Sequence, residues 1–200
     1  MSGNAICTLQ PSDAILHDYL AGLRSCIDEI EGQDVGAIAG VIYRTYLSGR
    51  QLFIFGNGGS AATASHMVCD LRKGAAVSGR QRIKAIALTD NISLLTAVGN
   101  DIDYESVFVE QLVGNVGKGD VALGISCSGN SPNVLAAIRY ARENGATTIG
   151  FTGFGGGKLK QMTDLCITLS SRDYGQVEDA HLSLEHIITC MVRQKIRGEG

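Results

Sequence analysis

The sequence has no strong excess of charge of either sign and no long apolar run. Its 17 lysines and arginines nearly balance its 20 aspartates and glutamates, which leaves a formal net charge of −3. Nothing therefore indicates a nucleic-acid or anionic-membrane surface. No apolar run approaches the roughly 20 residues of a membrane span, and no basic or apolar region of a secretory signal is visible at the start. We expect a cytoplasmic protein that binds neither membranes nor nucleic acids.

Paired cysteine motifs are also missing. The six cysteines are irregularly spaced, and none forms a CxxC pair. In a chain of this size without a visible secretory signal, such cysteines are more typical of buried free thiols than of disulfides or a cysteine-based zinc site. We therefore expect buried thiols at all six positions, which are Cys7, Cys26, Cys69, Cys127, Cys166 and Cys190.

Internal repeats, low-complexity tracts and linker-like stretches are absent as well. The apolar content of 44% suits a packed globular protein, and 200 residues suit one α/β domain. We predict a single domain over residues 1–200. It would consist of N-terminal helices over about 12–47 and an α/β core over about 51–197.

Short apolar runs alternate with helical patterns through the core. They predict strands over 51–55, 84–89, 120–126, 147–152 and 165–169. Helices are predicted between and after them, over 60–71, 94–98, 104–113, 133–143, 158–162 and 176–197. Strands that are apolar along their length indicate a doubly wound parallel sheet covered by helices on both faces. The two helices before the first strand are either a helical cover or a subunit interface, and we favour the interface.

One strand-to-helix turn combines a binding loop with a polar pair. The strand that ends at Phe55 breaks into Gly56–Gly59, and Ser60 then begins a helix. Free backbone N–H groups at such a helix start can hold an anion or a sugar. Further along, His66 and Asp70 are four residues apart and share one helix face. Taken alone, a pair of this kind is more often structural than functional.

A second turn, Ser126–Ser131, follows the third strand and places three serine hydroxyls and a glycine at a helix start. Hydroxyl groups, backbone N–H groups and the helix dipole can together bind a phosphate monoester without a lysine. A turn that only caps the helix is the alternative. A Walker loop is excluded because no Gly-Lys-Ser/Thr follows the glycines, and a dinucleotide fingerprint is excluded because Gly-x-Gly-x-x-Gly does not open the turn at 56–60.

Together these motifs closely resemble the SIS (sugar isomerase) domain and, within it, the phosphoheptose isomerases. The resemblance is carried by Gly56–Ser60, His66, Thr89–Asp90, Gly99–Asp101 and Gly124–Ser131. It implies a flavodoxin-like five-stranded parallel sheet and a homotetramer. It also implies an enzyme that converts sedoheptulose 7-phosphate to D-glycero-D-manno-heptose 7-phosphate in heptose biosynthesis.

The resemblance further implies roles for individual residues. The phosphate would be held by Ser60, Ser126, Ser128 and Ser131. The rest of the substrate would be contacted by Asn57, Gly58, Asp101 and Glu178. One zinc or other divalent ion, with no nucleotide cofactor, would be held by His66, Asp70, Glu178 and His186. Asp70 and His186 would be the acid/base pair that transfers protons through an enediolate.

Four features depart from the family pattern, and one is that an arginine common just after the first helix of the core has no clear counterpart, although Arg72 and Lys73 are near. Asp70 stands in place of the usual glutamate and is shorter by one methylene, about 1.5 Å. Glu178 replaces a usual glutamine and adds a negative charge, and Cys127 stands where a threonine is common. Two histidines and two carboxylates still form a donor set that suits zinc or another divalent ion.

The last predicted helix raises a geometric difficulty. Glu178 and His186 are eight residues apart, which is roughly 12 Å along a straight helix and about 80° around it. They could share one ion only if Glu178 lies at a distorted helix start. His181 and Glu185 form a separate pair, which we interpret as groups that support the ligands, contact a partner subunit or lie on the surface. If the Glu178 assignment fails, His181 is the expected substitute.

Two alternative functions stay open on the sequence alone. One is a non-catalytic SIS adaptor that binds the bacterial replication initiator protein. The presence of His66, His186 and two carboxylates favours the enzyme over this adaptor. The other is a phosphosugar-binding regulatory module. Such modules are usually joined to a DNA-binding or kinase domain, for which 200 residues leave no room.

Overall fold

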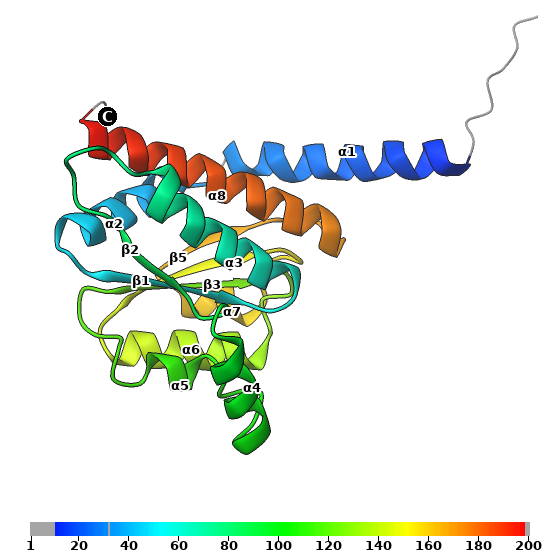
Figure 1. Ribbon diagram of the computed structural model, residues 1–200. Coiled ribbons are helices and arrows are strands. Elements are labelled where there is room, and N and C mark those ends of the chain that lie inside the picture. Colours follow the sequence, from blue (N-terminus) through cyan, green and yellow to red (C-terminus); the bar gives the residue numbers. More distant parts are fainter. Residues whose placement is uncertain (1–10, 32, 199–200) are drawn as a thin grey trace, which may run out of the picture.

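The computed structural model of the protein describes residues 11–31 and 33–198. Five parallel strands form one sheet in the order β2-β1-β3-β4-β5 (Figure 1). The strands are β1 Gln51–Gly56, β2 Lys84–Ala87, β3 Val121–Ser126, β4 Thr147–Thr152 and β5 Leu165–Thr168. Each agrees with its predicted range to within two residues.

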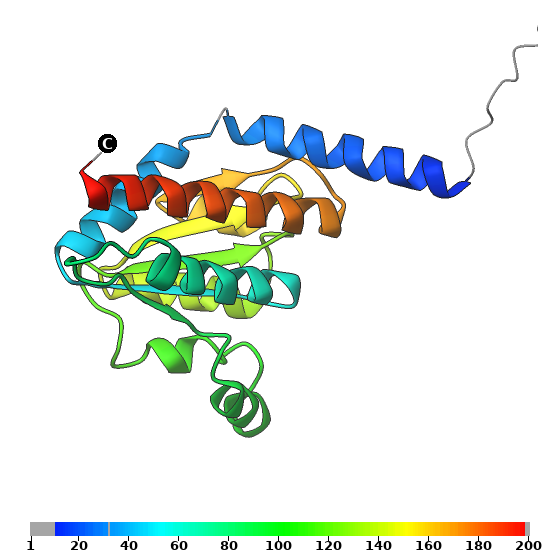
Figure 2. The same cartoon turned by 45° about the horizontal axis from the view of Figure 1, so that its top comes forward.

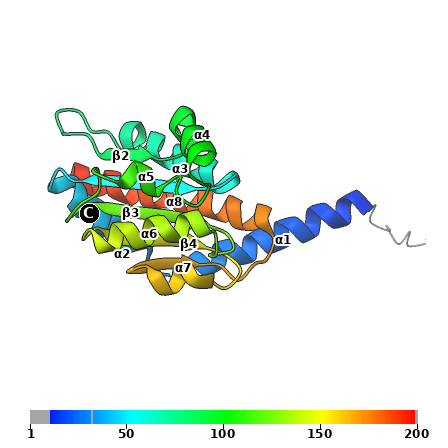
Figure 3. The same ribbon diagram turned by 90° about the horizontal axis from the view of Figure 1, so that it is seen from below.

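Helices cover both faces of this sheet. They are α1 Pro11–Glu31, α2 Val35–Leu47, α3 Gly59–Cys69, α4 Ile92–Asp101, α5 Val109–Leu112, α6 Pro132–Glu143, α7 Gly157–Met162 and α8 Tyr174–Arg197. The helices α2, α3 and α8 lie on one face, and α5, α6 and α7 lie on the other (Figures 1 and 3). Within the described ranges, no helix is both long enough and apolar enough to cross a membrane. The predicted doubly wound α/β fold with two leading helices is confirmed.

The strand side chains belong to two apolar core clusters, one on each face of the sheet. On β1, Leu52 and Ile54 belong to the cluster that includes α2, α3 and α8, whereas Phe53 and Phe55 belong to the cluster that includes α5 and α6. Successive strand residues point to opposite faces, and each buried side chain of this size contributes about 1.5–3 kcal/mol. The apolar run 51–55 therefore anchors both layers and fixes where β1 ends.

The sheet order creates a crevice between two strand ends. The chain leaves β1 toward β2 on one side, whereas β3 pairs with β1 on the other side. In open parallel sheets, ligands bind at the carboxyl ends of the strands where the order reverses in this way. Gly56 at the end of β1 pairs with Ile125 near the end of β3. The two polar turns singled out in the sequence are thus neighbours in space.

Three local features differ from the predictions. The helix from Gly59 is regular to Cys69 and then continues as a π turn, Asp70–Gly74, in which Ala75 N–H donates to the Asp70 carbonyl at 2.8 Å. The helix α4 continues past its predicted end at residue 98 to Asp101. The predicted helix over 104–113 shrinks to α5, because the Asp103 carboxylate accepts the Ser106 N–H at 2.7 Å and forms a turn there instead.

The first helix, α1, extends beyond the rest of the molecule (Figures 1 and 2). It is tied to α8 by Tyr19, whose hydroxyl donates to Asp179 at 2.6 Å, and to the segment after β5 by Glu29, which accepts from Ser170. Burial and the hydrogen bond to Asp179 accompany a Tyr19 pKa raised to about 12, with the hydrogen bond as the larger cause. Ile15 on α1 is 71% exposed. The interface role of α1 stays a prediction.

Five of the six cysteines lie in the described part of the chain, and all five are free thiols. Cys26 and Cys127 are buried, as predicted, and Cys166 is partly buried. The prediction of burial is wrong for Cys69 and Cys190, which lie on the outward sides of α3 and α8. The prediction for Cys7 falls outside the described residues.

Candidate active site

A pocket of about 140 Å³, here called the serine pocket, opens where β1 and β3 end. Its lining residues are Asn57, Ser60, Ile125, Ser126, Cys127, Ser128, Ser131, Tyr174 and Glu178. Six of the eight predicted phosphate and substrate residues are therefore gathered here. The other two lie outside the lining. Gly58 caps the start of α3 with a φ of 55°, and the exposed Asp101 ends α4, where it accepts a hydrogen bond from Asn100.

Glycines allow the two turns to approach each other and the neighbouring loop. A Cβ on Gly56 would lie 2.7 Å from the Ile125 carbonyl oxygen, so a larger residue would separate the turns. Gly129 has a φ of 64°, and a Cβ there would lie 2.0 Å from the Gly156 carbonyl oxygen. The loop that contains Gly156 also donates the Gly153 N–H to the Cys127 carbonyl at 2.8 Å. Backbone contacts with the loop after β4 therefore fix the position of the serine turn.

The hydroxyls of the serine turn point to a site for an acceptor-rich ligand. Ser126 and Ser131 bring their Oγ atoms to 3.0 Å, and Ser131 is the N-cap of α6 without a side-chain capping bond. Its hydroxyl can therefore donate to a ligand, and so can the backbone N–H of Asn133, the first N–H of α6 after Pro132. Within the described lining, these donors face a single acid, Glu178, and no lysine or arginine. Burial, followed by the charge of Asp179, raises the pKa of Glu178.

Tyr174 is a lining residue that the sequence reading missed. It begins α8, is 59% exposed and packs its ring 4.8 Å from that of Phe154. Phe154 has a φ of 54°, a left-handed conformation that is unusual for a bulky residue. The aromatic residue at the start of the last helix was the available signal.

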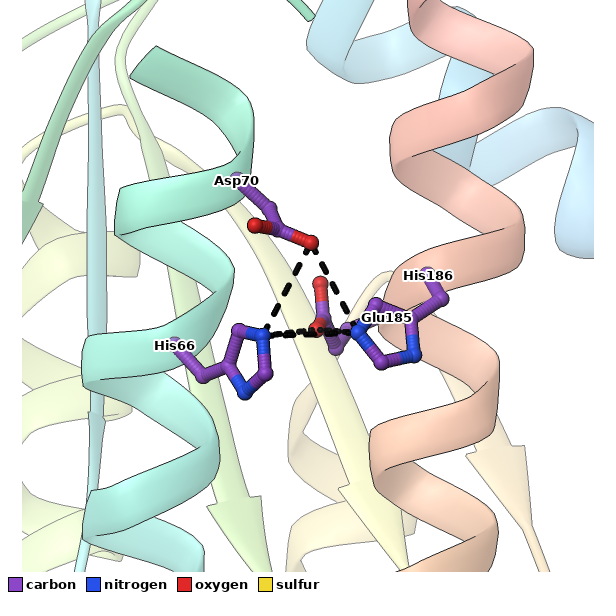
Figure 4. Close-up of side chains that lie close together, drawn as sticks. All are labelled: His66, Asp70, Glu185 and His186. Carbon is purple, nitrogen blue, oxygen red and sulfur yellow. Dashed lines mark hydrogen bonds and ion pairs between the residues drawn. The ribbon is translucent and has the colours of Figure 1, made fainter. Parts of the chain in front are cut away.

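A second group of polar side chains, here called the cluster, lies between α3 and α8 and consists of His66, Asp70, Glu185 and His186 (Figure 4). His66 and Asp70 come from α3 and its π turn, and Glu185 and His186 come from α8. The Nε2 atoms of the two histidines are 3.4 Å apart. From His186 Nε2, the nearest oxygens are Glu185 Oε1 at 3.2 Å and Asp70 Oδ2 at 3.6 Å. From His66 Nε2, both carboxylates lie at 3.8 Å.

This arrangement fits a divalent ion. One ligand atom from each of the four residues lies within 4.8 Å of the other three. Tetrahedral zinc ligands about 2.0–2.1 Å from the metal are about 3.3 Å from one another, which resembles the separations found here. Two imidazoles and two carboxylates are also donors that zinc accepts.

The burial and charge of Glu185 also indicate a cation site. Its side chain is fully buried, and neither carboxylate oxygen has a hydrogen-bond partner among the described residues. Burial, followed by the negative charge of Asp70, raises the pKa of Glu185 to about 8. An orphaned buried carboxylate beside a second acid is costly unless a cation compensates it. A bound cation would therefore stabilise this arrangement of side chains.

The cluster differs from the predicted ligand set at one residue. Glu178 lies at the pocket, two turns before His186 on a regular helix, and the expected rise of roughly 12 Å keeps it out of the cluster. Glu185 takes the fourth place. The sequence signal for it was a carboxylate three residues before Ile188, on the otherwise buried side of α8.

His181 is not the substitute, and neither it nor Glu185 lies on the surface. The His181 ring is fully buried and lies 5.8 Å from the Phe151 ring, toward the sheet. Burial lowers the pKa of His181 to about 4. A neutral imidazole on the sheet side of α8 is part of the core.

Comparison with known proteins places this geometry in a family. The family model for the SIS domain matches residues 18–153. A phosphoheptose isomerase of Aquifex aeolicus is 38% identical over 168 residues, which are 84% of this chain and 87% of that protein. A phosphoheptose isomerase of Rhodospirillum rubrum is 40% identical over 162 residues, which are 81% and 86% of the two chains.

Solved structures give the same family likeness. A phosphoheptose isomerase from Francisella tularensis superimposes with a TM-score of 0.85 and 25% identity, covering 93% of this chain and all (100%) of that one. The enzyme from Neisseria gonorrhoeae gives a TM-score of 0.82 and 28% identity over 91% and 98% of the two chains.

Proposed function

The chain belongs to the SIS domain family and is an isomerase, and we propose that it converts sedoheptulose 7-phosphate to D-glycero-D-manno-heptose 7-phosphate. Relatives at 38% and 40% identity are phosphoheptose isomerases, which supports this substrate and a place in heptose biosynthesis. The adaptor and the regulatory module gain no support from these relatives.

The observation that carries the proposal is the separation between the pocket and the cluster. The helices α3 and α8 lie side by side and run in the same direction (Figures 1 and 4). Each has one residue at the pocket and another at the cluster. Ser60 precedes His66 by six residues, a rise of roughly 9 Å, and Glu178 precedes His186 by eight, a rise of roughly 12 Å.

A seven-carbon sugar phosphate spans this separation. Eight bonds join C1 to the phosphorus atom, and an extended chain advances about 1.2 Å per bond, which gives about 10 Å. A three-carbon sugar phosphate has four such bonds and reaches only about 5 Å. With its phosphate in the serine pocket, the heptose chain places C1 and C2 at the cluster, whereas the shorter sugar stops midway.

The residues at the two ends have different tasks in this proposal. Ser60, Ser126, Ser128 and Ser131 bind the phosphate. Glu178 accepts hydrogen bonds from sugar hydroxyls, and Asn57 and Gly58 belong to the substrate loop. Asp101 stays proposed as a substrate contact at the end of α4.

We assign the metal ligands to His66, Asp70, Glu185 and His186, and zinc is the metal that their donor set suits best. When bound, such an ion would polarise the substrate carbonyl and stabilise negative charge on its oxygen. Asp70 and His186 are the proposed acid/base pair, because their side chains are 28% and 48% exposed and can meet the sugar. The fully buried Glu185 cannot do so. A general acid or base contributes about 10²–10⁴-fold to such a proton transfer.

We also propose that four copies of the chain assemble. Apolar side chains on α1, including Ile15 at 71% and Leu16 at 55% exposure, form a surface that a second copy can cover. The apolar groove lined by Ile27, Ile187 and Met191 adjoins it. Analytical ultracentrifugation of the full chain tests the tetramer, and a monomer at micromolar concentration would reject it.

Turnover of ketose phosphates of different length tests the function. The protein with added zinc is incubated with sedoheptulose 7-phosphate, fructose 6-phosphate and dihydroxyacetone phosphate, and the aldose products are measured. The heptulose should react by far the fastest. Faster turnover of a shorter ketose would reject the heptose assignment and keep the reaction class, and no turnover of any of them would reject both.

A further inference from the structure

The side chain of Asn57 is held by contacts from two other segments of the chain. Asn57 Nδ2 donates to Asn133 Oδ1 at 2.9 Å, and Asn133 Nδ2 donates back to Asn57 Oδ1 at 2.9 Å. The hydroxyl of Tyr104 donates to Asn57 Oδ1 at 3.0 Å. The loop after β1, the start of α6 and the segment after α4 therefore meet at one amide group.

One backbone group fixes the orientation of both amides. The N–H of Val134 donates to Asn133 Oδ1 at 3.0 Å, and a backbone N–H can only donate. The oxygen of Asn133 must therefore face Val134, which turns its NH2 group toward Asn57. The oxygen of Asn57 must then face Asn133, and the Tyr104 hydroxyl beside that oxygen must be a donor.

This network uses all the acceptor capacity of Asn57 and leaves it one donor. An amide oxygen has two lone pairs, and Asn133 and Tyr104 occupy both. Of the two N–H bonds of Asn57, one points to Asn133 and the other is left. Because Asn57 lines the serine pocket, the group that it can offer to a ligand is this N–H.

A fixed N–H donor at Asn57 favours anion binding in a pocket that has little else to offer an anion besides hydroxyl groups. The described lining contains no lysine or arginine, and it does contain the carboxylate of Glu178. A phosphate dianion is bound by donors, so an amide free to rotate would meet it with its oxygen in one of two orientations. The network excludes the repulsive orientation before the ligand arrives, which is preorganisation of a binding site.

We propose that Asn133 and Tyr104 are positioning residues that lock Asn57 as a hydrogen-bond donor to the phosphate of the substrate. Asn133 is only 2% exposed and does not line the pocket, so it acts through Asn57. The proposal rests on the assignment of the serine pocket to phosphate.

A double-mutant cycle tests this lock directly. Inorganic phosphate is titrated calorimetrically into the full chain and into the variants Asn57→Ala, Asn133→Ala and their combination. A hydrogen bond to a charged group is worth about 1.5–3 kcal/mol, so each single variant should bind phosphate at least about tenfold more weakly. If Asn133 acts through Asn57, the double variant should bind no more weakly than Asn57→Ala.

Tyr104→Phe gives a milder test that leaves the fold intact, because the residue is 64% exposed and its ring is kept. Loss of the hydroxyl should weaken phosphate binding about two- to threefold in the otherwise unaltered chain. In the Asn57→Ala background the same substitution should have no effect. Tyr43→Phe, in α2 and away from the pocket, is the matched control and should bind phosphate like the parent.

Additive losses in either cycle would overturn the proposal, since they would mean that Asn133 or Tyr104 acts independently of Asn57. Unchanged phosphate binding in Asn133→Ala and Tyr104→Phe would overturn it as well, as would absence of phosphate binding by the unaltered chain. If Asn133→Ala fails to fold in a thermal unfolding scan, the Tyr104→Phe cycle decides. Coupled phosphate binding without turnover of any ketose phosphate would reject the proposed isomerase reaction and leave the lock standing.

Discussion

The serine pocket and the cluster differ in how far the protein itself satisfies their polar groups. At the serine pocket, Ser126 is paired with Ser131, and Asn57 is paired with Asn133. At the cluster, the fully buried Glu185 has no hydrogen bond to either oxygen in the described structure, and only the two histidines approach its Oε1 atom. The pocket is therefore organised before its ligand binds, whereas the cluster needs a cation to balance it. The two sites thus differ in kind: the pocket is organised by hydrogen bonds, and the cluster is the one that a bound cation would stabilise.

Removing a histidine should break the cluster and leave the pocket intact. We expect His186→Ala to lose bound zinc and roughly a thousandfold in turnover, because a metal ligand and a proposed acid/base group disappear together. Elemental analysis and kinetics with sedoheptulose 7-phosphate measure both effects. His17→Ala, on the exposed face of α1, is the control. Full zinc content in His186→Ala would contradict the ligand assignment, and weaker phosphate binding would contradict the independence of the two ends.

A larger residue in the serine turn should destabilise the protein at the pocket. Gly129→Ala combines a φ of 64° with a Cβ only 2.0 Å from the Gly156 carbonyl oxygen, so it should lower the free energy of unfolding by about 3 kcal/mol. Gly155→Ala has a similar φ of 82° with open space around it, and should cost only about 1–2 kcal/mol. Urea denaturation measures both. Equal losses would mean that the close backbone contact is unimportant.

The buried carboxylate of Glu185 can be removed by mutation instead of being balanced by a cation. We expect Glu185→Leu to lose zinc affinity while the metal-free protein gains about 1–2 kcal/mol in unfolding free energy, since a buried unpaired acid is replaced by an apolar side chain. Zinc should raise the melting temperature of the parent and not of the variant. Glu143→Leu on the exposed side of α6 controls for the added apolar surface. A marked loss of metal-free stability would show that Glu185 is satisfied without an ion.

The smallest expected effect is at the acid of the pocket. Glu178→Gln should bind inorganic phosphate about three- to tenfold more tightly, because a negative charge beside the dianion is removed. Burial raises the pKa of Glu178, so the parent becomes protonated as the pH falls toward that value and the difference between the two proteins should narrow. Titration calorimetry at several pH values measures this. Asp179→Asn, the adjacent acid that accepts from Tyr19, is the control, and an equal gain there would contradict a local effect.

The pocket end could be predicted from the sequence and the cluster only in part. The apolar run to Phe55 and the glycines after it mark where β1 ends, and Ser126–Ser131 marks the end of β3 in the same local way. Strand order then brings the two turns together. The cluster depends on how α3 docks beside α8, and no local pattern sets that rotation. His66, Asp70 and His186 were predicted to share a site through the family resemblance, whereas Glu185 was not, because the resemblance put Glu178 in that place.

If the proposed substrate spans the serine pocket and the cluster, the parallel arrangement of α3 and α8 limits how the choice of sugar length can change. A ligand residue that moves one position along a helix advances about 1.5 Å, close to one carbon, but also turns about 100° away from the crevice. The next positions on the same face lie about 5.4 Å away, which corresponds to four carbons. The reactive end can therefore be relocated only in coarse steps. Selectivity for neighbouring sugar lengths has to evolve in the loops at the strand ends, which can be adjusted continuously.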